Sequence, residues 1–461
     1  MLQLKDIKSV YFIGIGGIGM SALARFFKYE GKEVAGYDRT QTDLTHKLEV
    51  EGISIHYTDD VDLISSTFKQ QLSCLVVYTP AVPKDHTELN FFRDNGFTVK
   101  KRAEVLGLLT QGMDGICVAG THGKTTISSM TAHLLKQSKV GCNAFLGGIT
   151  NNYKTNFLHD VKSPYVVLEA DEFDRSFLHL KPHFALVSAM DADHLDIYGD
   201  AEQVYAAFNE FVSLIGAGGA LLHKVGLPIN EPDEEVEIFT YSLDEEGDFY
   251  PTNLHLKNGL YQFDLQSPFG KISNVTLGIP GLVNVENAVG AMGLALLSGV
   301  EEDEIREALP KFSGIKRRFE YHVREEGMVY IDDYAHHPEE INATVKSVRA
   351  IYPEKELTVV FQPHLFTRTQ DFAEGFAKAL DKCDQIFLLD IYPARELPIE
   401  GVNSEMILKL MESEKVKVVK KEALLDELLK VKPELVLSLG AGDIDKLVPS
   451  LAEGLKDSIS N

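Results

Sequence analysis

The chain reads Cys117-Val118-Ala119-Gly120-Thr121-His122-Gly123-Lys124-Thr125-Thr126, and the rest of the sequence is organised around this segment. The apolar run 116–119 predicts a buried strand, and the residues after Lys124 repeat apolar side chains at helical spacing. A glycine turn between a strand and a helix presents backbone N–H groups and the positive end of the helix dipole to an anion. We therefore predict a phosphate-binding loop in which Lys124 reaches the β- and γ-phosphates and the Thr125 hydroxyl holds Mg²⁺. The full loop consensus has a glycine where this chain has Val118.

Composition and charge narrow the class of protein. With 461 residues the chain is too long for one core, and it predicts about two to four domains. Its 44% hydrophobic and 25% charged residues are those of an ordinary globular protein. The net charge of −24 disfavours nucleic acid and anionic membranes as partners. An anionic ligand must therefore bind at a local positive site.

Signals for a membrane or an oxidising compartment are not apparent in the sequence. The N-terminal region contains no signal-peptide cleavage site, and no apolar run reaches the roughly 18 residues of a membrane span. The cysteines are too far apart for a metal knuckle and imply no disulfide framework; they are Cys74, Cys117, Cys142 and Cys383. We expect a cytoplasmic protein with no membrane insertion and no nucleic-acid partner.

A second glycine turn lies near the N-terminus. The apolar run 10–13 predicts a strand, and it is followed by Gly14-Ile15-Gly16-Gly17-Ile18-Gly19 and by a helical pattern over 20–29. A further strand, 34–38, ends in Asp38. This is the Gly-x-Gly-x-x-Gly pattern in a strand–turn–helix setting, and it predicts that a nucleotide pyrophosphate binds at the start of the helix. Glycines that serve only helix–strand packing are the alternative.

Polar side chains follow two strands of the predicted central sheet. The strand 165–168 ends at Glu169, and the strand 184–188 leads to His194. Because ligand sites in doubly wound sheets lie at the carboxyl ends of the strands, we expect these side chains to lie near Thr125. Carboxylate oxygens and an imidazole at that edge suit Mg²⁺ shared with substrate phosphates. A solvated acidic loop is the plain alternative.

We predict an α/β fold of three domains, each with a mainly parallel sheet, because strands alternate with helical patterns. Residues 1–112 form a Rossmann-like domain, residues 113–314 a central phosphate-loop domain, and residues 315–461 a second Rossmann-like domain. Within the central domain, the segment 225–275 is rich in Asp, Glu, Gly and Asn and predicts a β-hairpin excursion from the main sheet. A strand at 329–334 opens the sheet of the third domain.

The three domains together indicate a class of reaction. One would bind a pyrophosphate-bearing substrate, one a nucleoside triphosphate with Mg²⁺, and the third offers His and Arg side chains to a small carboxylate. No nucleophilic Ser or Cys with a neighbouring base is apparent in the sequence. A triphosphate that acts on two bound substrates indicates a ligase.

The chain resembles the Mur ligase family over essentially its whole length, and within that family it is most similar to the members that add L-alanine. His122 inside the phosphate loop is typical of those members. The motifs that carry the resemblance are Phe12-Ile13-Gly14-Ile15-Gly16-Gly17-Ile18-Gly19-Met20-Ser21, Gly120-Thr121-His122-Gly123-Lys124-Thr125-Thr126, Glu169-Ala170-Asp171-Glu172, Asp193-His194, Asp332-Asp333-Tyr334-Ala335-His336-His337-Pro338, Phe361-Gln362-Pro363-His364 with Thr367-Arg368-Thr369, and Leu439-Gly440-Ala441-Gly442-Asp443.

The resemblance implies an ATP-dependent ligation in peptidoglycan precursor synthesis. ATP phosphorylates the lactyl carboxylate of UDP-N-acetylmuramate, and the amine of L-alanine attacks the resulting acyl phosphate. The implied partners are UDP-N-acetylmuramate, L-alanine and ATP, and the implied metal is Mg²⁺, with Mn²⁺ able to replace it. A monomer or a homodimer is expected. The runner-up within the family attaches a murein tripeptide to UDP-N-acetylmuramate.

The resemblance also assigns roles residue by residue. The expected catalytic residues are Lys124, Glu169 and His194. The expected metal ligands are Thr125, Glu169 and His194. The expected ATP-binding residues are Gly120, Thr121, His122, Gly123, Lys124, Thr125, Thr126, Asn284, Asn287, Arg317 and Asp332. The expected UDP-sugar-binding residues are Gly14, Gly16, Gly17, Ile18, Gly19 and Asp38. The expected amino-acid-binding residues are Tyr334, His336, His364 and Arg368.

The chain departs from the family pattern at three places. Val283 stands where the family often has His, so a ring contact there is lost. Leu365 stands where many members have Arg, which leaves Arg368 as the expected carboxylate clamp. The segment 205–208 has no lysine that could be carbamoylated, in agreement with the alanine-adding members.

Two rival functions come from other classes. A non-catalytic nucleotide-binding regulator is disfavoured because Lys124, Thr125, Glu169 and His194 are all present. A nicotinamide-dependent dehydrogenase would explain the first glycine turn and leave the second one without a role.

Overall fold

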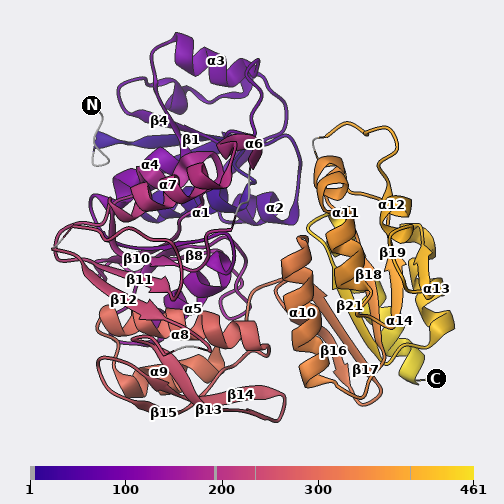
Figure 1. The fold of residues 1–461 in the computed structure, drawn as a ribbon. Helices are drawn as coiled ribbons and strands as arrows, with labels where there is room; N and C mark the ends of the chain where they lie inside the picture. Colours follow the sequence, from indigo (N-terminus) through magenta and orange to yellow (C-terminus); the bar gives the residue numbers. More distant parts are fainter. Residues whose placement is uncertain (1–5, 192–194, 234, 245, 395, 461) are drawn as a thin grey trace. The chain divides into compact units, whose positions relative to one another are not determined.

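The computed structural model describes residues 6–191, 195–233, 235–244, 246–394 and 396–460 (Figure 1). Its internal contacts divide the chain into two compact units. The first unit contains Met1–His255, Gln262–Leu277 and Glu286–Ser313. The second unit contains Leu256–Tyr261, Gly278–Val285 and Gly314–Asn461. Helices alternate with mainly parallel strands in both units, which confirms the predicted α/β class.

The N-terminal part of the first unit is a five-stranded parallel sheet in the order β3-β2-β1-β4-β5. Its strands are β1 (Ser9–Ile13), β2 (Glu33–Tyr37), β3 (Ser54–His56), β4 (Cys74–Tyr78) and β5 (Thr98–Lys101). Its helices are α1 (Ile18–Tyr29), α2 (Asp43–Val50), α3 (Thr87–Asp94) and α4 (Arg102–Thr110). The central strand β1 is buried along its whole length, which is why an apolar run marks it in the sequence. The strands predicted near 10–13 and 34–38 are confirmed, except that β2 ends before Asp38.

The central part of the first unit is a seven-stranded sheet in the order β12-β11-β10-β6-β9-β7-β8. Its strands are β6 (Asp114–Ala119), β7 (Asn143–Phe145), β8 (Phe157–Leu158), β9 (Tyr165–Glu169), β10 (Pro182–Val187), β11 (Ala220–Lys224) and β12 (Glu237–Tyr241). Its helices are α5 (Lys124–Gln137), α6 (Leu195–Tyr198), α7 (Ala201–Val212), α9 (Glu302–Ala308) and, from Glu286 onward, α8 (Leu282–Leu297). β6 lies between β9 and β10 and is parallel to both. The carboxyl ends of these three strands therefore meet at one edge of the sheet, where α5 begins.

The segment 225–275 leaves the central sheet only in part. β12 lies within this segment and extends the central sheet in parallel with β11. The strands β13 (Tyr250–Lys257), β14 (Leu260–Gln266) and β15 (Ile272–Thr276) form a separate three-stranded sheet (Figure 1). β14 and β15 pair antiparallel, which confirms the expected hairpin.

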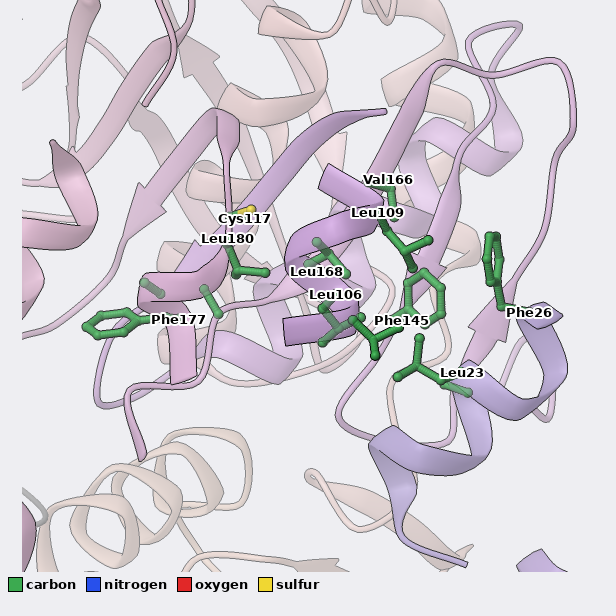
Figure 2. Close-up of a cluster of buried hydrophobic side chains, with 14 of the residues drawn as sticks. Leu23, Phe26, Leu106, Leu109, Cys117, Phe145, Val166, Leu168, Phe177 and Leu180 are labelled. Carbon is green, nitrogen blue, oxygen red and sulfur yellow. The ribbon is translucent and has the colours of Figure 1, made fainter. Parts of the chain in front are cut away.

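One hydrophobic core runs through both sheets of the first unit. Figure 2 shows Leu23 and Phe26 of α1 gathered with Leu109 of α4 and Phe145 of β7. The rings of Phe26 and Phe145 lie 5.6 Å apart, centre to centre. The core is therefore continuous across the domain boundary that the sequence predicts near residue 112.

The second unit is a six-stranded sheet in the order β16-β17-β21-β18-β19-β20. Its strands are β16 (Glu320–Glu325), β17 (Met328–Asp333), β18 (Leu357–Phe361), β19 (Gln385–Leu388), β20 (Val416–Val418) and β21 (Leu435–Leu439). Its helices are α10 (Pro338–Ile351), α11 (Phe366–Leu380), α12 (Ser404–Leu408), α13 (Leu424–Val431) and α14 (Val448–Ser460). Only the edge strand β16 pairs antiparallel among the strand pairs described in this sheet. The sheet has a buried cluster on each side, one with α10 and α11 and the other with α13 and α14.

Two further expectations concern composition. The four cysteines are all buried and free, as small core residues are. In the described part of the chain, the helices are too short or too polar to cross a membrane.

Candidate active site

The phosphate loop is the turn between β6 and α5. Gly120 and Gly123 have φ angles of 132° and 84°, and residues with a Cβ atom rarely adopt these backbone angles. A Cβ on Gly120 would lie 2.2 Å from Ser188 Oγ, so the loop also packs too closely for any larger residue there. Val118 is fully buried in β6 and pairs with Glu169 of β9. It is a strand residue, which explains why this loop has no glycine at that position.

The end of β10 holds the loop in place. Ser188 follows β10, and its hydroxyl donates to the carbonyl of Ala119 at 3.2 Å and to the carbonyl of His122. The Thr121 hydroxyl donates to Asp191 at 3.1 Å, and His122 Nε2 lies 3.5 Å from the same carboxylate. Sequence reasoning missed Ser188, because its contact with the loop depends on the pairing of β10 with β6.

Lys124 is the first residue of α5 and is held by three acceptors. Its Nζ donates to Glu172 Oε1 at 2.8 Å, to Glu172 Oε2 at 2.7 Å and to the carbonyl of Gly120 at 2.7 Å. Burial alone would lower the pKa of Lys124, but the carboxylates of Glu172, Asp171 and Glu169 raise it above the ordinary value. Lys124 is therefore protonated at physiological pH and places a buried positive charge beside the phosphate loop. Glu172 was visible only as part of a motif, with no role assigned.

Thr125 and Glu169 lie together as the sequence predicts. The Thr125 hydroxyl donates to the two carboxylate oxygens of Glu169 at 3.1 and 2.9 Å. A hydroxyl beside a carboxylate, next to a phosphate loop, fits Mg²⁺, which takes one or two protein oxygens and completes its shell with water and phosphate. His194, the third expected ligand, lies outside the described residues. Within the described ranges no cluster of three or more His, Cys, Asp and Glu side chains could hold a metal.

Three further expected ATP-binding residues lie on α5 and α8, and of these Asn284 belongs to the second unit while Thr126 and Asn287 belong to the first. Thr126 is buried in the first turn of α5. Asn284 and Asn287 are three positions apart on α8, which places them on one face of the helix. Asn287 lies against the loop, because a Cβ on Gly123 would be 2.8 Å from its Oδ1. Asn284 donates to the carbonyl of Pro280 at 2.7 Å.

The N-terminal glycine turn connects β1 to α1. Gly14 has a φ angle of 86°, and its N–H donates to the carbonyl of Tyr37 at 2.8 Å. Gly17 precedes α1 as its N-cap, and Ile18 is an exposed residue of the first turn. Asp38 accepts from the Gly16 N–H at 2.7 Å, so this carboxylate helps to hold the turn.

Arg102 brings a positive charge to this turn, and sequence reasoning missed it. A Cβ on Gly19 would lie 2.1 Å from Arg102 Nη1, so the guanidinium lies directly against the start of α1. Its Nη2 is 3.8 Å from Asp171. Arg102 follows Lys100 and Lys101, and this basic run in an acidic chain was the available signal.

In the second unit, Arg317 and Asp332 form a buried ion pair. Arg317 Nε lies 2.9 Å from Asp332 Oδ2, and Arg317 Nη2 donates to the carbonyl of Gly440 at 2.6 Å. The Ser438 hydroxyl donates to the other Asp332 oxygen at 2.6 Å. Asp333, beside this pair, accepts from the backbone N–H of Phe319 and of Ala335, and burial raises its pKa to about 6.

Three of the expected amino-acid-binding side chains form an aromatic cluster. The ring of His336 lies 5.2 Å from that of Tyr334 and 5.9 Å from that of His364. Burial, together with the neighbouring groups His336 and Arg368, lowers the pKa of His364 to about 4. Burial also lowers the pKa of His336, and Arg368 adds to that effect. Both imidazoles are therefore neutral at physiological pH. Arg368 acts on both of them as a positive charge, and the guanidinium of Arg318 lies 5.1 Å from the ring of Tyr334.

Two features beside this cluster were missed from the sequence. The ring of Tyr392 stacks on His364 at 5.8 Å. Leu365 has a φ angle of 67°, a strained conformation for a residue other than glycine, at the point where the chain turns from β18 into α11.

Family models match the chain in three successive segments. The model described as "Mur ligase family, catalytic domain" matches residues 9–113. The model described as "Mur ligase middle domain" matches residues 118–295. The model described as "Mur ligase, glutamate ligase domain" matches residues 317–442.

Curated relatives match over nearly the whole length. The UDP-N-acetylmuramate–L-alanine ligase of Phocaeicola vulgatus is 51% identical over 452 residues, which cover 98% of each chain. The enzyme of the same name from Porphyromonas gingivalis strain ATCC 33277 is 52% identical over 445 residues, or 96% of this chain and 98% of the relative.

Solved structures share the fold. The crystal structure of a UDP-N-acetylmuramate–alanine ligase from Thermotoga maritima has a TM-score of 0.80 at 27% identity, covering 98% of this chain and 99% of that one. A murein peptide ligase from Psychrobacter arcticus has a TM-score of 0.66 at 20% identity, with 98% and 99% covered.

Proposed function

Because this chain belongs to the Mur ligase family, we propose that it joins L-alanine to the lactyl carboxylate of UDP-N-acetylmuramate in an ATP-dependent reaction of peptidoglycan precursor synthesis. The observation that carries this function is 51% identity to an L-alanine-adding relative over 98% of both chains. The phosphate loop with a buried, charged lysine is the feature of the site that an ATP-dependent ligase requires.

The first unit holds the phosphates of ATP. Lys124 neutralises charge on the β- and γ-phosphates, and the backbone N–H groups of the loop orient them at the start of α5. Asn284 and Asn287 bind on the adenine side. Thr125 and Glu169 would hold Mg²⁺, which when bound supplies further charge neutralisation at the phosphate oxygens.

The same unit carries the sugar-nucleotide turn. The backbone N–H groups between β1 and α1 bind the UDP pyrophosphate, with Asp38 holding the turn through Gly16. Arg102 adds a positive charge beside Gly19. Because the protein as a whole is acidic, an anion binds only where such a local positive charge attracts it. The lactyl carboxylate attacks the γ-phosphate, ADP leaves, and an acyl phosphate forms.

The second unit binds the amino acid. The Arg368 guanidinium holds the carboxylate of alanine in a planar two-donor arrangement that lysine cannot copy. His336 and His364 orient the amine as neutral imidazoles. The amine attacks the acyl carbon, and phosphate leaves from the tetrahedral intermediate. Arg317 and Asp332 are assigned to ATP.

The domain division and the location of the protein complete the proposal. The domains are residues 1–112 for the sugar nucleotide, 113–314 for ATP and 315–461 for the amino acid. Because ATP and the sugar nucleotide are both substrates, the reaction belongs in the cytoplasm.

An ADP-release assay with UDP-N-acetylmuramate and a panel of amino acids tests this function. We expect L-alanine to give the highest kcat/KM and acidic amino acids to give almost none. The murein tripeptide belongs in the same panel as the competing substrate. A higher kcat/KM for the tripeptide than for L-alanine would replace the proposed function with the runner-up.

A further inference from the structure

Lys124 of the phosphate loop and Glu172 form a buried ion pair. Lys124 has three N–H donors, and all three are used by the two oxygens of Glu172 and the carbonyl of Gly120. The side chains are only 14% and 3% exposed. The ammonium therefore has no donor left for a phosphate oxygen unless one of these bonds is exchanged.

Glu172 is fixed to the body of the first unit. The Tyr198 hydroxyl donates to its backbone carbonyl at 2.6 Å, and the Arg175 N–H donates to the same oxygen at 3.0 Å. The chain then enters the core at Phe177, whose ring stacks on Phe211 at 5.0 Å (Figure 2 shows Phe177 in this core). Glu172 sits on an anchored turn, so the flexible Lys124 side chain is the partner that moves.

We propose that Glu172 is a positioning residue that acts through Lys124: it holds the ammonium in place before nucleotide binds and competes with the phosphates for it. This inference rests on the proposed role of the loop in binding ATP. When a phosphate arrives, Lys124 exchanges at least one bond from Glu172 to a phosphate oxygen. The buried carboxylate of Glu172 then loses part of its ion pair with Lys124. This loss costs free energy and so opposes nucleotide binding.

Glu172 also repels the phosphates directly. Glu172 Oε2 lies 2.7 Å from Nζ of Lys124, the residue proposed to bind the phosphates. Because both side chains are nearly buried, little water screens the negative charge of Glu172 from the phosphates. Both effects have the same sign, so the intact pair makes nucleotide binding weaker than the loop alone would allow. The benefit is a lysine that is already charged and ordered at the start of α5.

Calorimetric titration of ADP into the full chain, in buffer with EDTA and no divalent metal, tests this proposal. Glu172→Gln keeps the shape and removes the charge, and we expect it to lower the Kd for ADP about tenfold, equivalent to about 1.4 kcal/mol. Asp174→Asn is the matched control. Asp174 lies on the same turn and is partly exposed, but it pairs with Lys101 at 2.9 Å and not with Lys124. Its change in Kd should stay within about twofold if the effect is local.

Glu172→Asp provides a second variant if Glu172→Gln fails to fold. Its carboxylate is withdrawn by one methylene, so we expect binding tighter than wild type and weaker than Glu172→Gln. An unchanged or raised Kd in these variants without metal would overturn the proposal. So would an effect seen only when Mg²⁺ is present, because that would make Glu172 a metal ligand. If wild-type protein binds no ADP, the proposed function of the loop fails as well.

Discussion

Glu88 of α3 is a buried carboxyl group. From its environment we predict how the free energy of unfolding changes with pH. Its side chain is fully buried, accepting from the Tyr11 hydroxyl at 2.7 Å and from the Asp60 N–H at 3.1 Å. His56 Nε2 lies 3.4 Å away. Burial raises the pKa of Glu88 from 4.5 to about 7, while the bonds from Tyr11 and Asp60 oppose that rise.

The sign of the pH dependence follows from this raised pKa. Between the unfolded and folded pKa values, the folded state keeps a proton that the unfolded state has released. The free energy of unfolding therefore falls as pH rises through this window. The window is 7 minus 4.5, about 2.5 units, and at 1.36 kcal/mol per unit the loss reaches up to about 3 kcal/mol. Glu88→Gln removes the titration and keeps a neutral hydrogen-bonding group of the same size.

The assay is urea unfolding of wild type and Glu88→Gln at about pH 5 and about pH 8. The variant should gain stability relative to wild type by up to about 3 kcal/mol between the two pH values. Glu33→Gln serves as a control, because Glu33 is an exposed glutamate at the start of β2. Parallel pH profiles for wild type and Glu88→Gln would show that folding does not raise the pKa of Glu88.

Three further predictions concern the site. Gly120→Ala forces a Cβ onto a φ of 132° and within 2.2 Å of Ser188 Oγ, so ADP binding measured by calorimetry should weaken by about tenfold or more while circular dichroism is unchanged. Equal Kd values would contradict this. Arg368→Lys should raise the KM for L-alanine at least about tenfold and leave the Kd for ADP nearly unchanged, and a neutral effect would remove Arg368 from the carboxylate site. EDTA should abolish turnover, and Mg²⁺ or Mn²⁺ should restore it; persistent turnover in EDTA would contradict a metal held by Thr125 and Glu169.

The sequence predicts most of the fold, because the central strands are marked by local patterns. β18 is an apolar, β-branched run that is buried throughout, and β1 is another. Short and half-buried strands, several of them at sheet edges, are among those that were missed. β5 is half-buried and carries two lysines, and β20 has only three residues. Such strands are held mainly by backbone hydrogen bonds to a neighbouring strand. Their own residues therefore show little of the apolar pattern by which a strand is recognised in the sequence.

Prediction of the site has a similar limit. The phosphate loop is local, so its strand, glycine turn and helix can be recognised from neighbouring residues, and α5 begins at Lys124 as predicted. The partners of that loop come from elsewhere in the chain. Glu172 is 48 positions from Lys124, and Ser188 reaches the loop only because β10 lies beside β6. Asp38 was expected to bind the sugar nucleotide, and the structure shows its carboxylate accepting from Gly16 and Thr40.

Product analysis by mass spectrometry shows directly which substrate the protein joins to UDP-N-acetylmuramate. Wild-type protein and Lys124→Met are each incubated with ATP, UDP-N-acetylmuramate and an equimolar mixture of L-alanine and murein tripeptide. We expect UDP-N-acetylmuramoyl-L-alanine as the dominant product of wild type, with one ADP per bond formed, and no product from a folded Lys124→Met protein. Tripeptide product in excess, or ligation by Lys124→Met at the wild-type rate, would contradict this expectation.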